Sequence, residues 1–335
     1  MTEWIALSGA EAGCGPGCET DPLPRGSLLI GLSRPVADPT VVMELRMEGG
    51  RAGLSVMVDP ALGIGVIARA GSTMRRHWLA GPLPAGLKGG VTLNLSWDMA
   101  QGRWSLAAEG GGSGARATGT DPLPPPPGLG AALADAAQTP GAFHPAVLWW
   151  GLSRGIWRNP PGAALGPDTL VATPGGYVPL GRLRPGDRVL TLDQGAQPLA
   201  ALYRHAAPHR AALAPVRLRA GHFPIPRDML AGPQTRLLFD GAAVEYLFGT
   251  EEVLAAAGDI TDRLVAQRLR TGTASTLICP VTERPALILC DGVAVLSGAV
   301  NPALPAPRPC LRPYETAALL PDRPMAAELA PGLAA

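Results

Sequence analysis

Hydrophobic and polar residues alternate repeatedly from residue 27 to about residue 108. Alternation with a period of two predicts strands that bury one face, and clusters of turn-forming residues separate the runs. No helical pattern interrupts them, so this region is predicted to form an antiparallel β-sandwich. The runs are SLLIGLS, TVVMELRMEG, LSVMVD, GIGVIARAG and VTLNLSWDMAQGRWSLAAE.

The last of these runs predicts a β-hairpin. Val91, Leu93, Leu95 and Trp97 share one face, and DMAQG turns the chain into RWSLAAE. The pattern is similar to lectin-like, jelly-roll sandwiches, which often bind sugars, so a carbohydrate is a candidate partner. We prefer the interpretation that Trp97 and Trp104 are core aromatics facing each other across the hairpin.

A Gly/Pro-rich stretch, EGGGSGARATGTDPLPPPPGLG at residues 109–130, predicts a linker or long exposed loop. AALADAAQT then predicts two helical turns. The following run, AVLWWGLSRGIW, resembles SLLIGLSRP near the start, which indicates either a repeat or two neighbouring strands of one sheet. We therefore assign residues 1–158 to the first domain.

Short strands and tight turns also organise the second half of the chain. Residues 168–193, DTLVATPGGYVPLGRLRPGDRVLTLD, predict three strands joined by a PGG turn and by LRPGD, where Pro185 and Gly186 suit the bend. This stretch resembles the first block of Hint domains, the module shared by hedgehog C-terminal regions and inteins. The matching residues are Thr169, Val171, Thr173, Gly175, Leu183, Gly186, Asp187 and Val189.

The resemblance continues downstream and favours the bacterial, free-standing Hint subgroup. Residues 215–260 are similar to the middle of that subgroup, where DMLAGPQTRLLF matches the second block and EYLFGTEEVLAAAGDI matches the stretch that follows. STLICPVTERPALILCDGVAVLSGAVNP is similar to the closing hairpin. The expected fold is mainly β throughout, with a Hint-type all-β domain at residues 163–303. Residues 304–335 are predicted to be a Pro-rich C-terminal tail that contacts this domain or another protein.

The resemblance implies self-processing by an acyl shift. A Cys or Ser at the first position attacks the preceding peptide carbonyl, and a histidine in the second block protonates the departing amide nitrogen. These two positions fall on Ala164 and Thr235, and a further family histidine falls on Pro285. None of these side chains can do the family's chemistry, so no catalytic residue is expected. The motif residues Thr169, Thr173, Gly186 and Asp187 are retained.

Three functions remain open after this comparison. We prefer a non-catalytic Hint protein with a structural or binding role, because the family's nucleophile and histidines are missing. The alternatives are autoprocessing near Gly162–Ala164 by an unrecognised nucleophile, and carbohydrate binding by the sandwich. An engineered Ala164 would not account for Thr235 or Pro285, so we prefer natural loss of the nucleophile.

Other histidines and cysteines suggest no metal site or cofactor. His205, His209 and His222 are predicted to face solvent in loops, since Pro208 interrupts the His-x3-His spacing. Nucleotide-binding, serine-hydrolase and zinc-protease motifs are missing from the sequence. Cys14 and Cys18 flank GPG, where a disulfide or half of a metal site stays open. The remaining cysteines are expected to be packing residues: Cys279, Cys290 and Cys310.

Composition narrows the class of partner. A net charge of +1 with scattered arginines gives no reason to expect nucleic acid. An apolar run of about 18 residues is missing, so no membrane span is expected. The N-terminal residues lack the basic and apolar regions of a standard signal peptide, which predicts a protein that is cytoplasmic or exported by another route.

Overall fold

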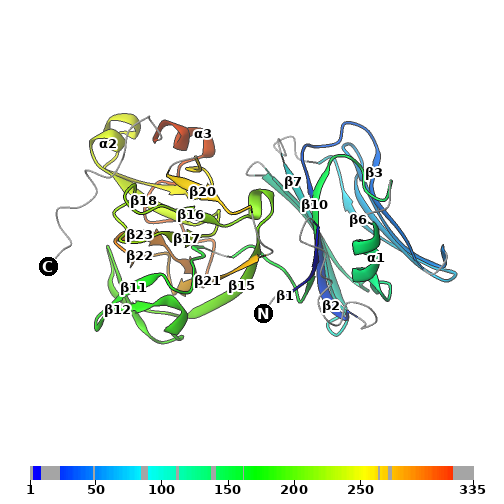
Figure 1. The fold of residues 1–335 in the computed structure, drawn as a ribbon, viewed down its shortest axis with the longest axis horizontal. Helices are drawn as coiled ribbons and strands as arrows, with labels where there is room; N and C mark the ends of the chain where they lie inside the picture. The colour runs from blue at the N-terminus through cyan, green and yellow to red at the C-terminus, as the bar shows by residue number, and fades with distance from the viewer. Residues whose placement is uncertain are drawn as a thin grey trace. The chain divides into compact units, whose positions relative to one another are not determined.

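β-strands make up most of the regular structure in the computed structural model, which describes residues 3–8, 23–47, 50–83, 90–110, 113–136, 141–160, 162–262, 265–270 and 274–319. Contacts divide the chain into two compact units, Met1–Arg158 and Asn159–Ala335 (Figure 1). Both units are mainly β, as the sequence predicts.

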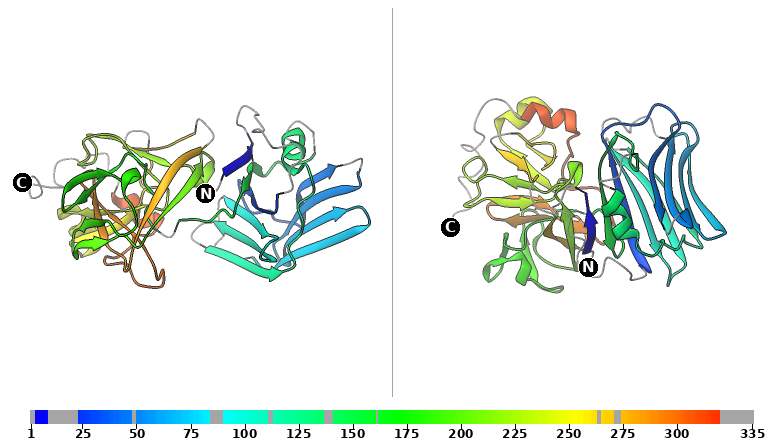
Figure 2. Two further views of the ribbon diagram at one scale, coloured as in Figure 1. Left: turned by 90° about the horizontal axis from the view of Figure 1, so that it is seen from below. Right: turned by 45° about the vertical axis from the view of Figure 1, so that its right-hand side comes forward.

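The first unit contains two antiparallel sheets that form a sandwich (Figure 2). One sheet has the order β1-β10-β2-β7-β8-β9, and the other has the order β3-β4-β5-β6. The six strands of the first sheet are β1 (Glu3–Leu7), β2 (Arg25–Leu32), β7 (Val91–Asp98), β8 (Arg103–Gly110), β9 (Ser113–Thr120) and β10 (Val147–Arg154). Those of the second are β3 (Thr40–Met47), β4 (Ala52–Asp59), β5 (Gly63–Ala70) and β6 (Thr73–Ala80).

The alternating pattern of the sequence accounts for the core of this sandwich. Leu28 and Ile30 on β2 belong to the same buried cluster as Leu54 and Val56 on β4. Their neighbours in the sequence, Ser27 and Ser55 among them, point to the opposite faces, because successive side chains of a strand alternate. Burying each aliphatic side chain contributes about 1.5–3 kcal/mol to folding. The helix α1 (Leu129–Ala136) adds Leu129 and Leu133 to the cluster.

Two pairings expected from the sequence are confirmed. Strand β10 pairs antiparallel with β2, so the two similar segments are neighbouring strands of one sheet. Strands β7 and β8 form the predicted hairpin, with Trp97 opposite Trp104. Trp97 is buried in the core. Trp104 is partly buried against the same core, and the Trp104 indole stacks on the His77 ring.

The prediction of a linker or long exposed loop at residues 109–130 is wrong for most of that range, which contains regular structure. Strand β9 occupies Ser113–Thr120 and pairs with β8 at the sheet edge. The sequence SGARATGT lacks large apolar residues, so its strand character comes from backbone pairing and not from an alternating apolar face. Gly119 is required there, since a Cβ would lie 2.7 Å from the indole Nε1 of Trp104.

The second unit is built from one eight-stranded sheet and two three-stranded sheets. The eight-stranded sheet contains β11 (Leu170–Thr173), β12 (Gly176–Pro179), β13 (Arg188–Thr191), β14 (Gly195–Pro198), β18 (Arg236–Asp240), β19 (Glu252–Ala256), β22 (Leu287–Cys290) and β23 (Val293–Leu296). The smaller sheets are β15 (Ala201–Pro208), β21 (Ala274–Thr282) and β24 (Gly298–Ala299), and β16 (Val216–Leu218), β17 (Met229–Ala231) and β20 (Ala266–Arg268). Helix α2 (Ala242–Phe248) follows β18.

The described part of the predicted C-terminal tail packs on the second unit. Leu254 of β19 donates to Pro309 and accepts from Leu311, each at 2.8 Å. Helix α3 (Pro313–Thr316) follows, and Leu311 and Leu319 are buried in the core of the unit. Residues up to 319 are therefore part of this fold, and residues 320–335 lie outside the described residues.

Candidate functional site

Residues 163–166, which include the expected nucleophile position, pair with strands of the second unit on two sides through isolated bridges at Leu165. Leu165 pairs with Ile278 of β21 on one side and with Ala231 of β17 on the other. The amide of Ala163 donates to Leu296, and that of Gly166 donates to Leu230. The backbone around the expected cleavage point is therefore held by main-chain hydrogen bonds.

The structure brings Ala164 and Thr235 together, although 71 residues separate them in the chain. The Ala164 amide donates to the Thr235 hydroxyl at 3.0 Å, and that hydroxyl donates to the Ala164 carbonyl, also at 3.0 Å. Thr235 is 0% exposed and Ala164 is 1% exposed. The residue expected at the second-block position thus contacts the amide nitrogen of the residue expected at the first position.

This contact differs chemically from a proton transfer. A threonine hydroxyl has no pKa near neutrality, so it supplies one donor and its lone pairs but no exchangeable charge. Its donor and one acceptor site are used by the backbone of Ala164. The methyl group of Ala164 packs beside Ala207 and Leu277 and offers no nucleophile.

Gly162, just before this segment, lies too close to the backbone of β24 to carry a side chain. A Cβ at Gly162 would be 2.3 Å from the amide nitrogen of Gly298 and 2.7 Å from the carbonyl carbon of Ser297. This close approach fixes the chain immediately upstream of Ala164.

Two further nucleophile-bearing residues, which sequence reasoning missed as candidates, lie near Gly162. Burial raises the pKa of the Cys279 thiol to about 12, against the opposing effect of the Gly162 and Gly298 backbone N–H groups. This thiol is protonated at neutral pH, whereas nucleophilic attack requires the thiolate. The Ser297 hydroxyl is 2.6 Å from that of Thr282 and accepts from the amide of Ala286. Only the structure reveals this proximity, because β21 and β24 pair in parallel.

Pro285, the expected place of a third family residue, lies in the turn between β21 and β22. Its carbonyl accepts a hydrogen bond from the Gln194 side chain at 3.1 Å. A proline ring has neither a donor nor a titratable group, so this position provides only a backbone acceptor.

The retained motif residues shape turns. The Thr173 hydroxyl donates to Gly176 at 2.6 Å and closes the β11–β12 turn, and buried Thr169 leads into β11. Gly186 adopts a φ of 95°, and the Asp187 carboxylate accepts from the Arg184 amide at 2.8 Å. These contacts support the LRPGD turn expected from the sequence.

A buried carboxylate that the sequence analysis did not single out sits in the β22–β23 turn. Asp291 is 4% exposed and accepts from the Leu170 amide at 3.0 Å, which ties the turn to β11. The guanidinium of Arg227 lies 3.8 Å from its second oxygen. The signal in the sequence was Asp291–Gly292, a dipeptide typical of tight hairpin turns.

The expectation that the histidines of this unit face solvent in loops is wrong for His205, which lies on a strand, and the other two are half-buried. His205 lies on β15 opposite Leu277, and burial lowers its pKa to about 4. The half-buried His209 ring is 2.8 Å from the Ser275 hydroxyl, because the loop folds back on β21. His222, in the turn after β16, is half-buried.

Within the described residues, no three His, Cys, Asp or Glu side chains are arranged to hold a metal ion. Cys14 and Cys18 lie outside those residues, as do the contacts expected of them. Cys279 and Cys290 are buried, whereas Cys310 is exposed. A search of the described helices finds none long and apolar enough to span a bilayer.

Comparison with solved structures finds likenesses at low identity, and a search of the curated proteins finds no match. The MchDnaB-1 intein is 12% identical, with a TM-score of 0.28 over 40% of this chain and 99% of the intein chain. The Ruminococcus gnavus IT-sialidase CBM40 is 12% identical, with a TM-score of 0.31 over 48% of this chain and 94% of its own. A heptameric SAP-like pentraxin from Limulus polyphemus is 11% identical, with a TM-score of 0.22 over 42% of this chain and 69% of its own.

Comparison with family models gives the more direct result. Residues 163–298 match the model of the Hint domain. The match begins one residue before Ala164 and ends at Gly298 of β24, so it spans the region whose geometry is described above. This chain therefore contains a Hint domain at residues 163–298.

Proposed function

We propose that the Hint domain of this chain has lost self-processing and serves a structural or binding role. The observation that carries the proposal is the pair of hydrogen bonds between Thr235 and the backbone of Ala164. In a working Hint domain these positions hold the proton donor and the nucleophile. Here they hold a neutral hydroxyl and a methyl group, and both are buried.

The autoprocessing alternative needs another nucleophile near the peptide bond before Ala164. Thr235 is the nearest hydroxyl, but its hydrogen bonds to Ala164 give it no general base. Cys279 is protonated at neutral pH, because burial raises its pKa to about 12. Ser297 is hydrogen-bonded to Thr282 and Ala286. None of the three has the activated state that an acyl shift requires.

Hydroxylamine tests this proposal, because it cleaves any ester or thioester formed by an acyl shift, even a transient one. The full-length native chain is incubated with hydroxylamine at neutral pH and its mass is measured. We expect only the intact chain. A fragment ending near residue 163 would contradict the proposal, and Thr235→Val, Cys279→Ala and Ser297→Ala would then identify the nucleophile.

A second candidate function belongs to the sandwich, for which we propose carbohydrate binding. The supporting observation is a row of hydroxyl side chains, here called the hydroxyl row, that crosses five strands in register on the face of the sheet away from the core. The row consists of Ser153, Ser27, Ser96, Ser105 and Thr118. Ser153, Ser27 and Ser96 are buried, whereas the hydroxyls of Ser105 and Thr118 at the end of the row can donate to and accept from sugar hydroxyls. Binding of the full chain to immobilised glycans tests this role.

A further inference from the structure

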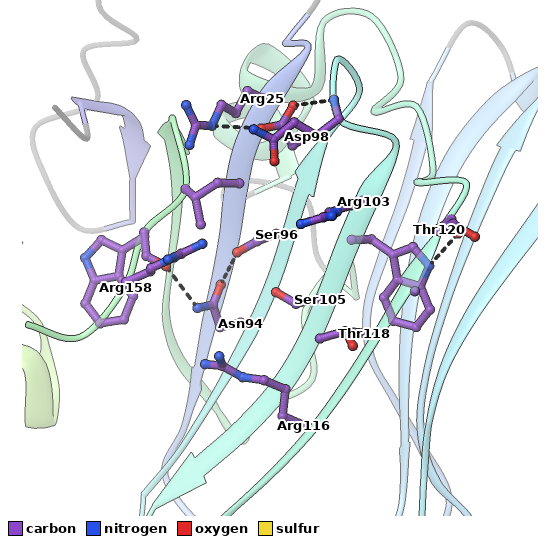
Figure 3. A pocket seen from close by; sticks show the side chains of 15 residues that line it. Arg25, Asn94, Ser96, Asp98, Arg103, Ser105, Arg116, Thr118, Thr120 and Arg158 are labelled. Carbon is purple, nitrogen blue, oxygen red and sulfur yellow. Dashed lines mark hydrogen bonds and ion pairs between the residues drawn. The ribbon is translucent and has the colours of Figure 1, made fainter. Parts of the chain in front are cut away.

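The hydroxyl row forms part of the floor of a pocket in the sandwich unit (Figure 3). The pocket has a volume of about 480 Å³, which is in the range of small-ligand sites. Residues of β2, β7, β8 and β9 and the segment after β10 line it. Ser96 and Asn94 are nine-tenths or more buried at its base.

Hydrogen bonds connect the polar side chains at the base of this pocket to one another and to Trp157. Ser96 is 2.8 Å from the Ser27 hydroxyl and donates to the Asn94 side chain at 3.0 Å. The backbone amide of Trp157 donates to Ser27 at 2.8 Å, and the Asn94 amide group reaches the Trp157 carbonyl at 3.5 Å. Residues 156–158 are thereby held against the sheet as one wall of the pocket.

Some polar side chains that line the pocket make no hydrogen bond with other described residues. The hydroxyls of Ser105 and Thr118 have no hydrogen-bond partner among the described residues, and they continue the floor toward the sheet edge. The guanidinium groups of Arg103 and Arg158 likewise make no ion pair or hydrogen bond within the described ranges. Both arginines are exposed, so their donors are available to a ligand.

Charge distinguishes this pocket from a neutral sugar site. Four arginines line it, and Asp98 is the one carboxylate among its lining residues. Asp98 already pairs with Arg25 at 3.2 Å, and Arg116 lies 3.5 Å from Glu109. Figure 3 shows Arg103, Arg116 and Arg158 around Ser96 and Ser105. Guanidinium groups bind carboxylates through two parallel hydrogen bonds, so an anionic ligand complements this surface.

From this arrangement we infer that the pocket binds an acidic oligosaccharide, one whose sugar units carry carboxylate groups. The open arginines, Arg103 and Arg158, bind the carboxylates, while Ser105 and Thr118 bind sugar hydroxyls. This inference rests on the proposed carbohydrate-binding role of the sandwich and specifies the class of ligand. The interaction weakens as salt is raised, because exposed arginines contribute charge that salt screens.

A glycan array with four arms tests the inference on the full-length chain. The arms are carboxylated glycans containing uronic or sialic acids, sulfated glycans, neutral glycans, and polyglutamate as a carboxylate polymer without sugars. We expect the carboxylated arm to bind at least about tenfold more tightly than the other three. The double variant Arg103→Gln/Arg158→Gln should lose this binding by at least about tenfold.

The matched control is Arg34→Gln, which removes an exposed arginine of the same unit that does not line the pocket. It should bind as the native chain does, and unchanged thermal unfolding of the double variant separates lost binding from lost folding. Equal binding of neutral glycans would overturn the acidic ligand and keep the carbohydrate role. Preference for sulfated glycans would overturn the carboxylate assignment. Binding to no glycan, or equally to polyglutamate, would overturn both the inference and the carbohydrate role.

Discussion

In the Hint domain, the hydroxyl of Thr235 donates to and accepts from the backbone of Ala164, and both residues are closed to solvent. In the sandwich, the hydroxyls of Ser105 and Thr118 have no hydrogen-bond partner among the described residues. Both regions have polar groups in a defined geometry, but only the sandwich has hydroxyls that are available to bind a ligand. A satisfied, buried hydroxyl stabilises the fold, whereas an open one contributes little to folding and is free to bind a ligand.

The largest effect on stability is expected from Gly162→Ala, which tests how closely the chain before Ala164 packs against β24. The new Cβ would meet the Gly298 backbone nitrogen at 2.3 Å, so the chain at residue 162 must move away from β24. We expect a loss of about 3 kcal/mol in unfolding free energy, measured by urea denaturation. Gly175→Ala is the control, since the nearest atom to its Cβ lies at 3.9 Å. Equal stability of the two variants would contradict the close packing.

Removing the Thr235 hydroxyl should have the next largest effect. Thr235→Val keeps the shape but leaves the buried Ala164 amide without its acceptor. We expect unfolding free energy to fall by about 2 kcal/mol in urea denaturation. A change below about 0.5 kcal/mol would show that these hydrogen bonds do not hold the segment.

Acid should weaken the second unit through His205. Burial lowers its pKa to about 4, whereas the unfolded histidine keeps a value of about 6.5. Between these values the unfolded state binds more protons, so stability is complete above pH 6.5 and falls as pH falls toward 4. We expect a loss of about 2 kcal/mol between about pH 7 and about pH 5, measured by urea denaturation. His205→Phe should reduce this loss, and an unchanged loss would assign it to other groups.

The smallest effect on stability is expected from the same Thr-to-Val change in the sandwich. Thr118 is exposed on the edge strand β9, so Thr118→Val should alter unfolding free energy by less than about 0.5 kcal/mol. Its effect should appear in glycan binding instead, as a several-fold loss on the carboxylated array. A stability loss as large as that of Thr235→Val would remove the contrast between the two regions.

The sequence predicted those features that arise from local patterns or from family blocks. Alternation identified the β7–β8 hairpin, and similarity between two apolar runs identified the β2–β10 pair. Strand β9 was missed because SGARATGT has no apolar face and is held by backbone pairing with β8. His205 was misplaced in a loop because only its cross-strand partner Leu277 reveals the strand.

The Ala164–Thr235 contact and the sandwich pocket also differ in how far the sequence predicts them. Ala164 and Thr235 could be selected from the sequence because the Hint blocks fix their positions in the family. The pocket of the sandwich could not, because Arg25, Arg103 and Arg158 meet only after the order of the strands is known. The hydroxyl row also depends on the register of five strands, which no local pattern specifies.

Intact mass tests most directly the claim that the Hint domain is closed and inactive. The native chain is purified at full length and incubated at neutral pH over days, with and without added thiol, and its mass is followed. We predict one species at the full mass of 34.4 kDa in both conditions. A second species that corresponds to cleavage between residues 162 and 164 would contradict the account, because some group near Ala164 would then be performing the acyl shift.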